Sequence, residues 1–188
     1  MERKALIRNL GSGLSAAALE EFASAWEPGF VAKGEILARQ GEETSREVML
    51  LNGKMTSQIA DAEGRGVCVG LYVGPGFVTP HIARTRDNVS LVTLEVTEDA
   101  TVAVLNADDL LTMMLRSPEI RDWANGILRD ELSRKTEREW CLAALGGADR
   151  LAWFRERHPY HEDLFAHHQI ASFLGMTPVT FSRLRARF

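Results

Sequence analysis

The chain has 188 residues, of which 45% are hydrophobic and 26% are charged, and its formal net charge at pH 7 is −4. This composition is that of an ordinary globular protein with a sizeable core, which excludes the disordered, collagen-like and disulfide-stapled classes. No stretch reaches the roughly 18 apolar residues of a membrane helix, and the first residues lack the apolar run of a signal peptide. We therefore expect a cytoplasmic protein without a membrane partner.

A short helix and then a β-rich region open the chain. Residues 14–26 contain a serine N-cap, Ser15, followed by apolar residues at helical spacing. Between Gly29 and Leu105, short runs rich in Val, Leu, Ile and Thr alternate with Gly and Asp, and residues 61–66 are typical of a hairpin loop. Strands of this size at near-regular spacing predict an antiparallel β-roll or jelly roll.

A long helix follows the predicted strands. Ser117 and Pro118 supply an N-cap and a first helical residue, and the helical pattern continues to the glycine at 146, about 28 residues in all. Its apolar stripe lasts for about two heptads, which predicts a dimerisation helix. Packing of this helix on its own chain alone is the alternative. The residues expected at the dimer interface are Ile120, Trp123, Ala124, Ile127 and Leu128.

The last 41 residues predict three short helices, of which the final two form a helix-turn-helix. Gly175 stands where the chain must turn sharply, and Thr177 and Pro178 provide the N-cap and first residue of the last helix. Three apolar residues of that helix, at spacings of three and four, are expected to be buried: Phe181, Leu184 and Phe188.

The opposite side of the last helix predicts a DNA-reading surface. Val179, Ser182 and Arg183 share this side, where an arginine can bond guanine O6 and N7 together and a valine can touch a thymine methyl. Arg185 and Arg187 are expected to contact phosphate. Residues 148–188 carry six arginines against four acidic residues, a net +2, so the preceding residues sum to −6. A basic tip on an acidic body favours a polyanionic partner, and chance clustering on a solvated surface is the alternative.

Two motifs and their order resemble the Crp/Fnr family of bacterial transcription regulators. The first is KGEILARQGE followed by LLNGK, within residues 33–54, and the second is LGMTPVTFSRLR, residues 174–185. With the strand-rich region and the long helix between them, the resemblance covers nearly the full length. It implies a homodimer with an effector domain of the cyclic-nucleotide-binding fold, a long dimer helix and a DNA-binding domain. The expected DNA contacts are then Thr177, Val179, Thr180, Ser182, Arg183, Arg185 and Arg187.

The region matching the family's cyclic-nucleotide cassette departs from it. Thr79 and Pro80 stand where the family carries Gly-Glu, and Ser90 stands near its expected Arg. A proline lacks a backbone donor and cannot replace a carboxylate that accepts from ribose hydroxyls. We therefore expect that cyclic AMP and cyclic GMP are not bound in the family's mode. The loop either gathers a small anion or is a solvated basic loop, and the candidate effector residues are Thr79, His81, Arg84, Arg86 and Ser90.

Three further departures concern DNA recognition and cofactor binding. Val179 stands where oxygen-sensing relatives carry Glu, so the operator is expected to differ. The N-terminal cysteines that hold an iron-sulfur cluster in such relatives are missing, and we expect no cofactor. The sequence ends at Phe188 without the β-hairpin wing of many relatives, which predicts weaker and more salt-sensitive DNA binding.

Other reactive side chains do not form an established site in the sequence. Residues 158–168 hold four histidines, but their spacing matches no known metal site, and His81 is the only histidine in the predicted roll. We therefore expect that the protein binds no metal ion. No nucleophile elbow, phosphate-binding loop or paired-carboxylate motif is present, so we expect that the protein is not an enzyme. Cys68 and Cys141 are expected to be packed thiols.

The predicted fold class is α+β, in three parts. Residues 1–116 form the effector domain, residues 117–147 the dimerisation helix and hinge, and residues 148–188 the wingless helix-turn-helix domain. The expected function is a DNA-binding transcription regulator under an unknown effector. The alternative is a ligand-binding or protein-interaction module whose helical tail does not read DNA. The expected partners are double-stranded DNA, a second copy of the chain, RNA polymerase and a small anionic effector.

Overall fold

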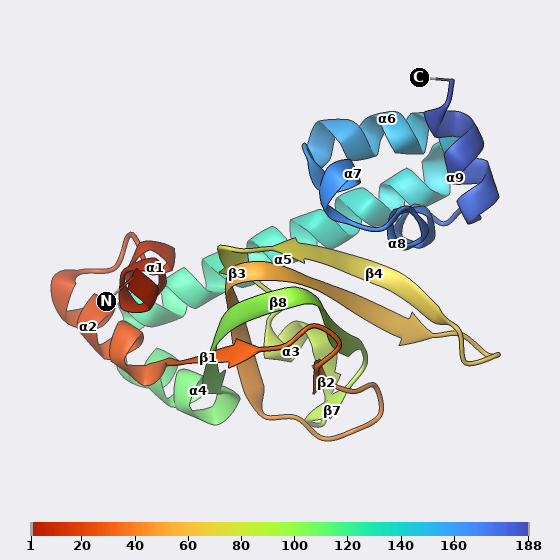
Figure 1. Ribbon diagram of the computed structural model, residues 1–188. Coiled ribbons are helices and arrows are strands. Elements are labelled where there is room, and N and C mark those ends of the chain that lie inside the picture. The colour runs from red at the N-terminus through yellow and green to blue at the C-terminus, as the bar shows by residue number, and fades with distance from the viewer. Residues whose placement is uncertain (1, 188) are drawn as a thin grey trace.

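An antiparallel sheet forms the centre of the structure, a computed structural model that describes residues 2–187 (Figure 1). Its strands are β1 (Glu27–Val31), β2 (Ile36–Ala38), β3 (Arg46–Ala60), β4 (Gly66–Val73), β5 (Gly76–Phe77) and β8 (Thr93–Asn106). The strand order is β1-β8-β3-β4, with β2 paired to β8 and β5 paired to β3. A separate two-stranded sheet consists of β6 (Thr85–Arg86) and β7 (Val89–Ser90).

Strand β3 divides its side chains between two apolar cores. Leu50 packs inside the roll with Leu94 and Val102, whereas Met49 and Leu51 pack on the opposite face. Successive side chains of a strand point to opposite faces, so a continuous apolar run shows that both faces are covered. The helices over the second face are α1 (Glu2–Leu10), α2 (Ala16–Ala25), α4 (Ala107–Arg116) and the first turns of α5 (Pro118–Ala144).

The hairpin predicted at residues 61–66 joins β3 to β4. Asp61 Oδ1 accepts hydrogen bonds from the backbone N–H groups of Glu63 and Arg65, at 3.0 and 2.8 Å. Gly64 has φ +79°, a conformation that glycine adopts without steric cost. The short polar side chain and the glycine together explain why the chain reverses here.

Helix α5 begins where the sequence predicts and runs from the N-terminal helices to the C-terminal ones (Figure 1). The Oγ of Ser117 accepts from the N–H of Ile120 at 3.3 Å, which caps the helix. Ile120 has no exposed surface, and the Trp123 ring packs on Phe22 and Phe77, with centroids 4.5 and 5.3 Å away. Both residues were expected at a dimer interface, but α2 and β5 flank this part of α5 and place them against their own chain.

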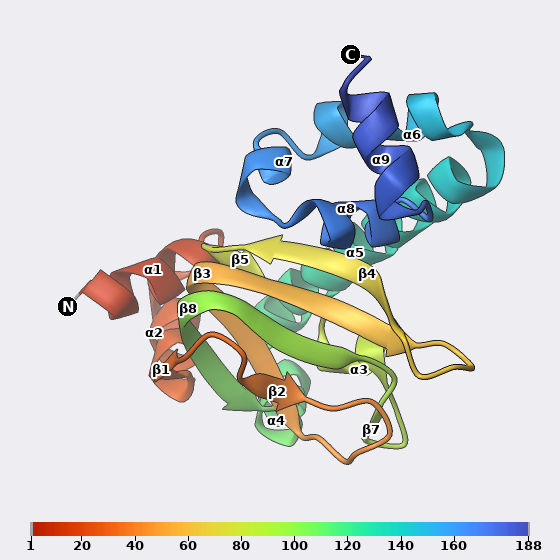
Figure 2. The ribbon, with the colours of Figure 1, turned by 45° about the vertical axis from the view of Figure 1, so that its right-hand side comes forward.

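The C-terminal residues form a small helical unit beside β4 (Figure 2). Its helices are α6 (Gly147–Arg157), α7 (His161–Leu164), α8 (His167–Phe173) and α9 (Pro178–Arg185). Leu151, Phe154, Ile170 and Phe181 fill the centre of this unit. Cys68 of β4 belongs to the same apolar cluster, so the unit packs against β4, whereas the core inside the roll is a separate cluster.

The predicted α+β architecture of an antiparallel roll, a long helix and a small helical C-terminal unit is confirmed. The remaining helix, α3 (His81–Arg84), lies in the loop between β5 and β6. Across residues 2–187, none of the helices has the length and apolar character that crossing a bilayer requires.

Candidate nucleic-acid interface and effector cavity

A tight turn joins α8 to α9. Gly175 has φ +62°, and its N–H donates to Ser172 O at 3.0 Å, while the N–H of Met176 donates to Ala171 O at 3.0 Å. Thr177 Oγ1 then accepts from the N–H of Thr180 at 3.1 Å and caps α9. These contacts match the predicted roles of the glycine and the threonine in a helix-turn-helix.

Helix α9 separates a buried side from an exposed side. Phe181 has no exposed surface and Leu184 is half-buried, whereas Val179 is 60% exposed and Ser182 and Arg183 are exposed. Thr177, Thr180, Arg185 and Arg187 are exposed as well. Phe188, which was expected to be buried, lies outside the described residues. The residues predicted to contact DNA thus share the accessible surface of α9 and its cap.

The two arginines of α9, Arg183 and Arg185, differ in their surroundings. Arg185 Nε lies 3.2 Å from Glu162 Oε1, and its Nη1 lies 2.7 Å from His167 Nε2. Arg155 also binds Glu162, through Nε at 2.7 Å and Nη2 at 3.1 Å, and this contact lowers the pKa of the Glu162 carboxyl. Arg183 forms no ion pair with any residue that the structure describes, so it is free to meet a ligand.

Arg150 supports the turn before α9, a role that the sequence did not reveal. Its Nη2 donates to Leu142 O at 2.8 Å and its Nε to Leu145 O at 2.9 Å, both at the end of α5. Its Nη1 donates to Leu174 O at 3.1 Å, in the turn between α8 and α9. The acceptors are backbone carbonyls rather than acidic side chains. The sequence therefore gives no sign that Arg150 has a structural role.

Helix α8 connects the helical unit to the roll and to α5 through hydrogen bonds. Ser172 Oγ accepts from the N–H of Cys68 at 2.9 Å. Arg138 of α5 donates to Phe173 O at 3.1 Å and to Cys68 O at 3.2 Å, and its guanidinium lies 4.6 Å from the Phe173 ring centroid. Burial raises the pKa of the Cys68 thiol to about 11, so this thiol stays protonated at neutral pH.

A cavity of about 600 Å³ lies between the roll and α5. Thr79 and Arg84 line it from the roll, and Lys135, Arg138 and Glu139 line it from α5. Its side chains therefore include three cations and one acid. Such an excess of positive charge favours an anionic ligand.

Arg84 is buried rather than solvated. Only 1% of its surface is exposed; its Nε donates to Thr79 O at 3.1 Å and its Nη2 donates to Arg46 O. Its Nη1 has no hydrogen-bond partner among the described residues. Burial lowers the pKa of this guanidinium, and Glu47 partly offsets that effect.

A chain of hydroxyl groups connects the roll to α5. Ser57 Oγ lies 3.1 Å from Tyr72 OH, which lies 2.6 Å from Thr79 Oγ1. Thr79 in turn donates to Glu131 Oε1 at 2.5 Å. Because Thr79 has only one hydroxyl proton, Tyr72 must donate to Thr79 and Ser57 to Tyr72. Glu131 is 4% exposed and also pairs with Arg134 at 2.7 Å, yet in the sequence it is an ordinary helical acid.

The other predicted effector residues do not line this cavity. The His81 ring is held by Thr44 O at 2.7 Å, and Ser90 Oγ donates to Val92 O at 2.7 Å. Arg86 is exposed. The structure therefore places Thr79 and Arg84, but not the other three candidates, at this cavity. Within residues 2–187 no cluster of three or more His, Cys, Asp or Glu side chains is placed to hold a metal ion.

Comparison with known proteins gives a match at the level of fold. No protein-family model and no curated protein matches the sequence. Among solved structures, FixK2 from Bradyrhizobium japonicum is 16% identical, with 86% of this chain and 83% of that chain covered and a TM-score of 0.77. The c-di-GMP-responsive global regulator CLP from Xanthomonas campestris is 14% identical, with 92% and 91% covered and a TM-score of 0.73. A putative crp/fnr-family regulator from Eubacterium rectale is 18% identical, with 95% and 85% covered and a TM-score of 0.72.

Proposed function

We propose that this chain, which has the fold of the Crp/Fnr regulators, is a dimeric DNA-binding transcription regulator that reads the major groove with α9. The observation that carries the proposal is the division of α9 into a buried side at Phe181 and an exposed side at Val179, Ser182 and Arg183. A helix held in this way can enter a groove without losing its own packing.

The chemistry of the exposed side fits the edges of base pairs. Arg183 has no competing carboxylate among the described residues, and its planar guanidinium can donate to O6 and N7 of one guanine. Val179 offers an apolar contact to a thymine methyl, and Ser182 a hydroxyl to a base or phosphate. Thr177 and Thr180 stand at the start of α9, where their hydroxyl groups can meet phosphate.

Arg185 and Arg187 have a positioning role in this proposal. Arg187 is exposed and available to phosphate. Arg185 already contacts Glu162, so phosphate would replace that carboxylate as its partner. Such contacts orient the protein on the duplex and carry no sequence information.

Two copies would associate through α5. Ala124, Ile127 and Leu128 are half-buried in one chain, and Leu132, one turn further on, is 55% exposed. We propose that these four residues face the second copy, while Ile120 and Trp123 stabilise their own chain. The effector domain then comprises residues 1–116, the dimer helix and hinge 117–147, and the DNA-binding domain 148–188. Two reading helices would meet half-sites about one helical turn apart, and RNA polymerase would be the partner on promoter DNA.

The effector in this proposal is a small anion in the cavity between the roll and α5, which we call the anion cavity. Arg84, Lys135 and Arg138 supply positive charge there, and Arg84 Nη1 lacks a partner among the described residues. Thr79 is already bonded to Glu131, and Pro80 offers no carboxylate to ribose. Cyclic AMP is therefore expected to give no heat in calorimetry at micromolar concentration, and tight binding would contradict this view of the cassette.

Selection of duplexes from a random pool tests the function itself. The expected result is enrichment of a roughly two-fold symmetric site whose affinity exceeds that of random duplex by at least about 10³-fold at physiological salt. Equal binding of all duplexes, lost as salt is raised, would instead favour a module whose tail does not read DNA.

A further inference from the structure

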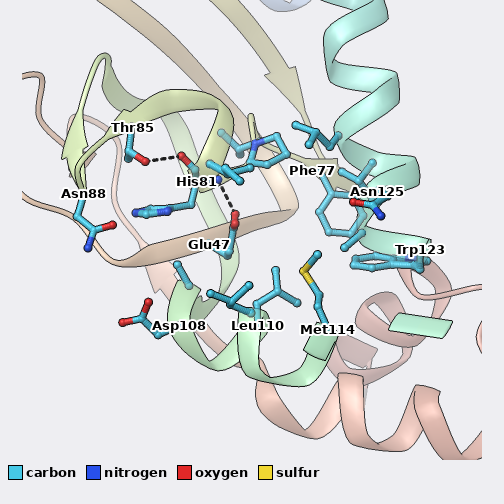
Figure 3. Close-up of a pocket in the computed structure, with 18 of the residues that line it drawn as sticks. Glu47, Phe77, His81, Thr85, Asn88, Asp108, Leu110, Met114, Trp123 and Asn125 are labelled. Carbon is cyan, nitrogen blue, oxygen red and sulfur yellow. Dashed lines mark hydrogen bonds between the residues drawn. The ribbon is translucent and has the colours of Figure 1, made fainter. Parts of the chain in front are cut away.

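A second cavity, of about 390 Å³, lies where β5 and α3 meet α4 and the first half of α5 (Figure 3). Phe77 and Trp123 stand on its α5 side, and Leu110 and Met114 rise from α4. Its volume falls in the range of small-molecule sites. We call it the α4 cavity. Neither the proposed DNA contacts nor the proposed binding of an anion involves it.

Glu47 is a half-buried carboxylate in the lining of the α4 cavity. Glu47 Oε2 accepts from the backbone N–H of His81 at 2.9 Å. The His81 ring is held by Thr44 O at 2.7 Å, and the Arg84 guanidinium is bonded to Thr79 O and Arg46 O. Glu47 forms no ion pair with any described residue. Burial raises the pKa of its carboxyl group, and the hydrogen bond from His81 N–H and the charge of Arg84 only partly offset that effect. A half-buried carboxylate without an ion-pair partner is stabilised by a cation that binds beside it.

The side chains around the α4 cavity carry negative charge, whereas those around the anion cavity carry mostly positive charge. Asp87 and Asp108 line it in addition to Glu47, and no lysine or arginine is found among the described residues around it. Phe77 and Trp123 form an aromatic wall, with ring centroids 5.3 Å apart at an interplanar angle of 70°. Carboxylates and aromatic faces are the two groups that attract an organic cation.

We propose that the α4 cavity binds a small organic cation, an ammonium group carried on an aromatic or alkyl body. The ammonium lies toward Glu47, and the body packs between the aromatic wall and the side chains of Leu110 and Met114. Methionine adapts its shape readily, which suits a ligand of this kind. Because α5 lines both cavities, such a ligand would act on the same helix as the anion. The proposal does not depend on whether the chain reads DNA.

A second copy of the chain is a poorer occupant than a cation. Ala124, Ile127 and Leu128 at the rim belong to the proposed dimer face, so a partner lies nearby. An apolar partner segment that filled the cavity would leave Glu47 desolvated and unpaired, which is costly. A small cation removes that cost.

Three ligands of one shape and different charge test the proposal on the full chain. Calorimetry compares 2-phenylethylammonium with the neutral 2-phenylethanol and the anionic 3-phenylpropanoate. We expect the cation to bind at least about tenfold more tightly than the alcohol, and the carboxylate not to bind. Equal affinities, or no binding of any of the three, would overturn the proposal, the latter because the cavity would then be closed by a second copy.

Two variants and one control locate the site. Glu47→Gln keeps the shape of the side chain and is expected to abolish the preference for the cation over the alcohol. Leu111→Trp alters a rim residue that is 52% exposed, and its larger ring is expected to block binding without disturbing the core. Glu63→Gln, at the tip of the β3–β4 hairpin, is the matched control and should bind as the wild type does. An unchanged preference in Glu47→Gln, or unchanged binding in Leu111→Trp, would refute the assignment.

Discussion

Thr79 Oγ1 lies 2.5 Å from Glu131 Oε1, and this contact joins the loop after β5 to the middle of α5. The carboxylate is 4% exposed and is also held by Arg134 and Lys135, at 2.7 and 3.3 Å. It ends the hydroxyl chain that starts at Ser57 inside the roll. The roll and the long helix are therefore connected by a buried polar network, in addition to their apolar packing.

Removal of the carboxylate is expected to weaken this connection. Glu131→Ala leaves the Thr79 hydroxyl without its acceptor, and the loss of a buried charged partner costs about 3 kcal/mol of unfolding free energy. Glu131→Gln retains an acceptor and should cost less. Urea unfolding measures the free energy of unfolding of both variants. Glu139→Ala, at an exposed position of the same helix, is the control and should stay within about 0.5 kcal/mol of the wild type. A Glu131→Ala protein as stable as this control would show that the network contributes nothing.

Local spacing was enough to predict some of the site but not all of it. The exposed side of α9 follows from residues three and four apart on one helix, so Val179, Ser182 and Arg183 could be identified from the sequence. The positions of Ile120 and Glu131 depend on which elements flank α5, and the sequence of α5 alone does not contain that information. The burial of Arg84 could not be predicted either, because its hydrogen-bond acceptors are the backbone carbonyls of Thr79 and Arg46, which have no signature in a sequence.

Loss of the Arg150 guanidinium is expected to loosen the turn before α9. Arg150→Ala leaves the carbonyls of Leu142, Leu145 and Leu174 without their charged donor, at a cost of about 2 to 4 kcal/mol. Hydrogen exchange should become faster at Gly175 and Met176 while the strands of the roll keep their protection. Arg129→Ala, at an exposed position of α5, is the control. Equal exchange in both variants would mean that Arg150 does not hold the turn.

The stability of the helical unit is expected to fall as the pH is lowered. Burial first, and then the nearby His161, lower the pKa of the His158 imidazole from 6.5 to about 4. Between these values the unfolded chain binds a proton that the folded chain does not, so stability present above pH 6.5 is lost as the pH falls toward 4. After allowance for solvent screening, the loss is about 1 to 2 kcal/mol.

The variant His158→Phe isolates this effect. It retains the ring that packs near Phe154 and Phe173, at centroid distances of 5.1 and 5.6 Å, and removes the titration. Thermal unfolding over this pH range should then be less pH-dependent. A residual slope is expected from His161, whose pKa burial also lowers. The exposed His168→Phe is the control, and an identical slope in both variants would exclude His158 as the source.

Charged substitutions on α5 test the proposed dimer face. The double variant Leu128→Glu and Leu132→Glu places two carboxylates on α5, and like charges across a two-fold axis repel. Sedimentation equilibrium is expected to show a dimer for the wild type and a monomer for the variant. Leu115→Glu, on a leucine of α4 that is 79% exposed, should remain dimeric. A variant that still forms dimers would place the interface elsewhere.

The most direct measurement of the central claim is the DNA affinity of Arg183→Ala on the selected duplex and on duplexes with single base-pair changes. Arg116→Ala, which alters an exposed arginine of α4, is the control. If α9 reads the groove, Arg183→Ala loses about 1 to 3 kcal/mol of binding free energy and becomes indifferent to the identity of one base pair, whereas the control keeps both. Unchanged affinity and unchanged base preference in Arg183→Ala would contradict the account.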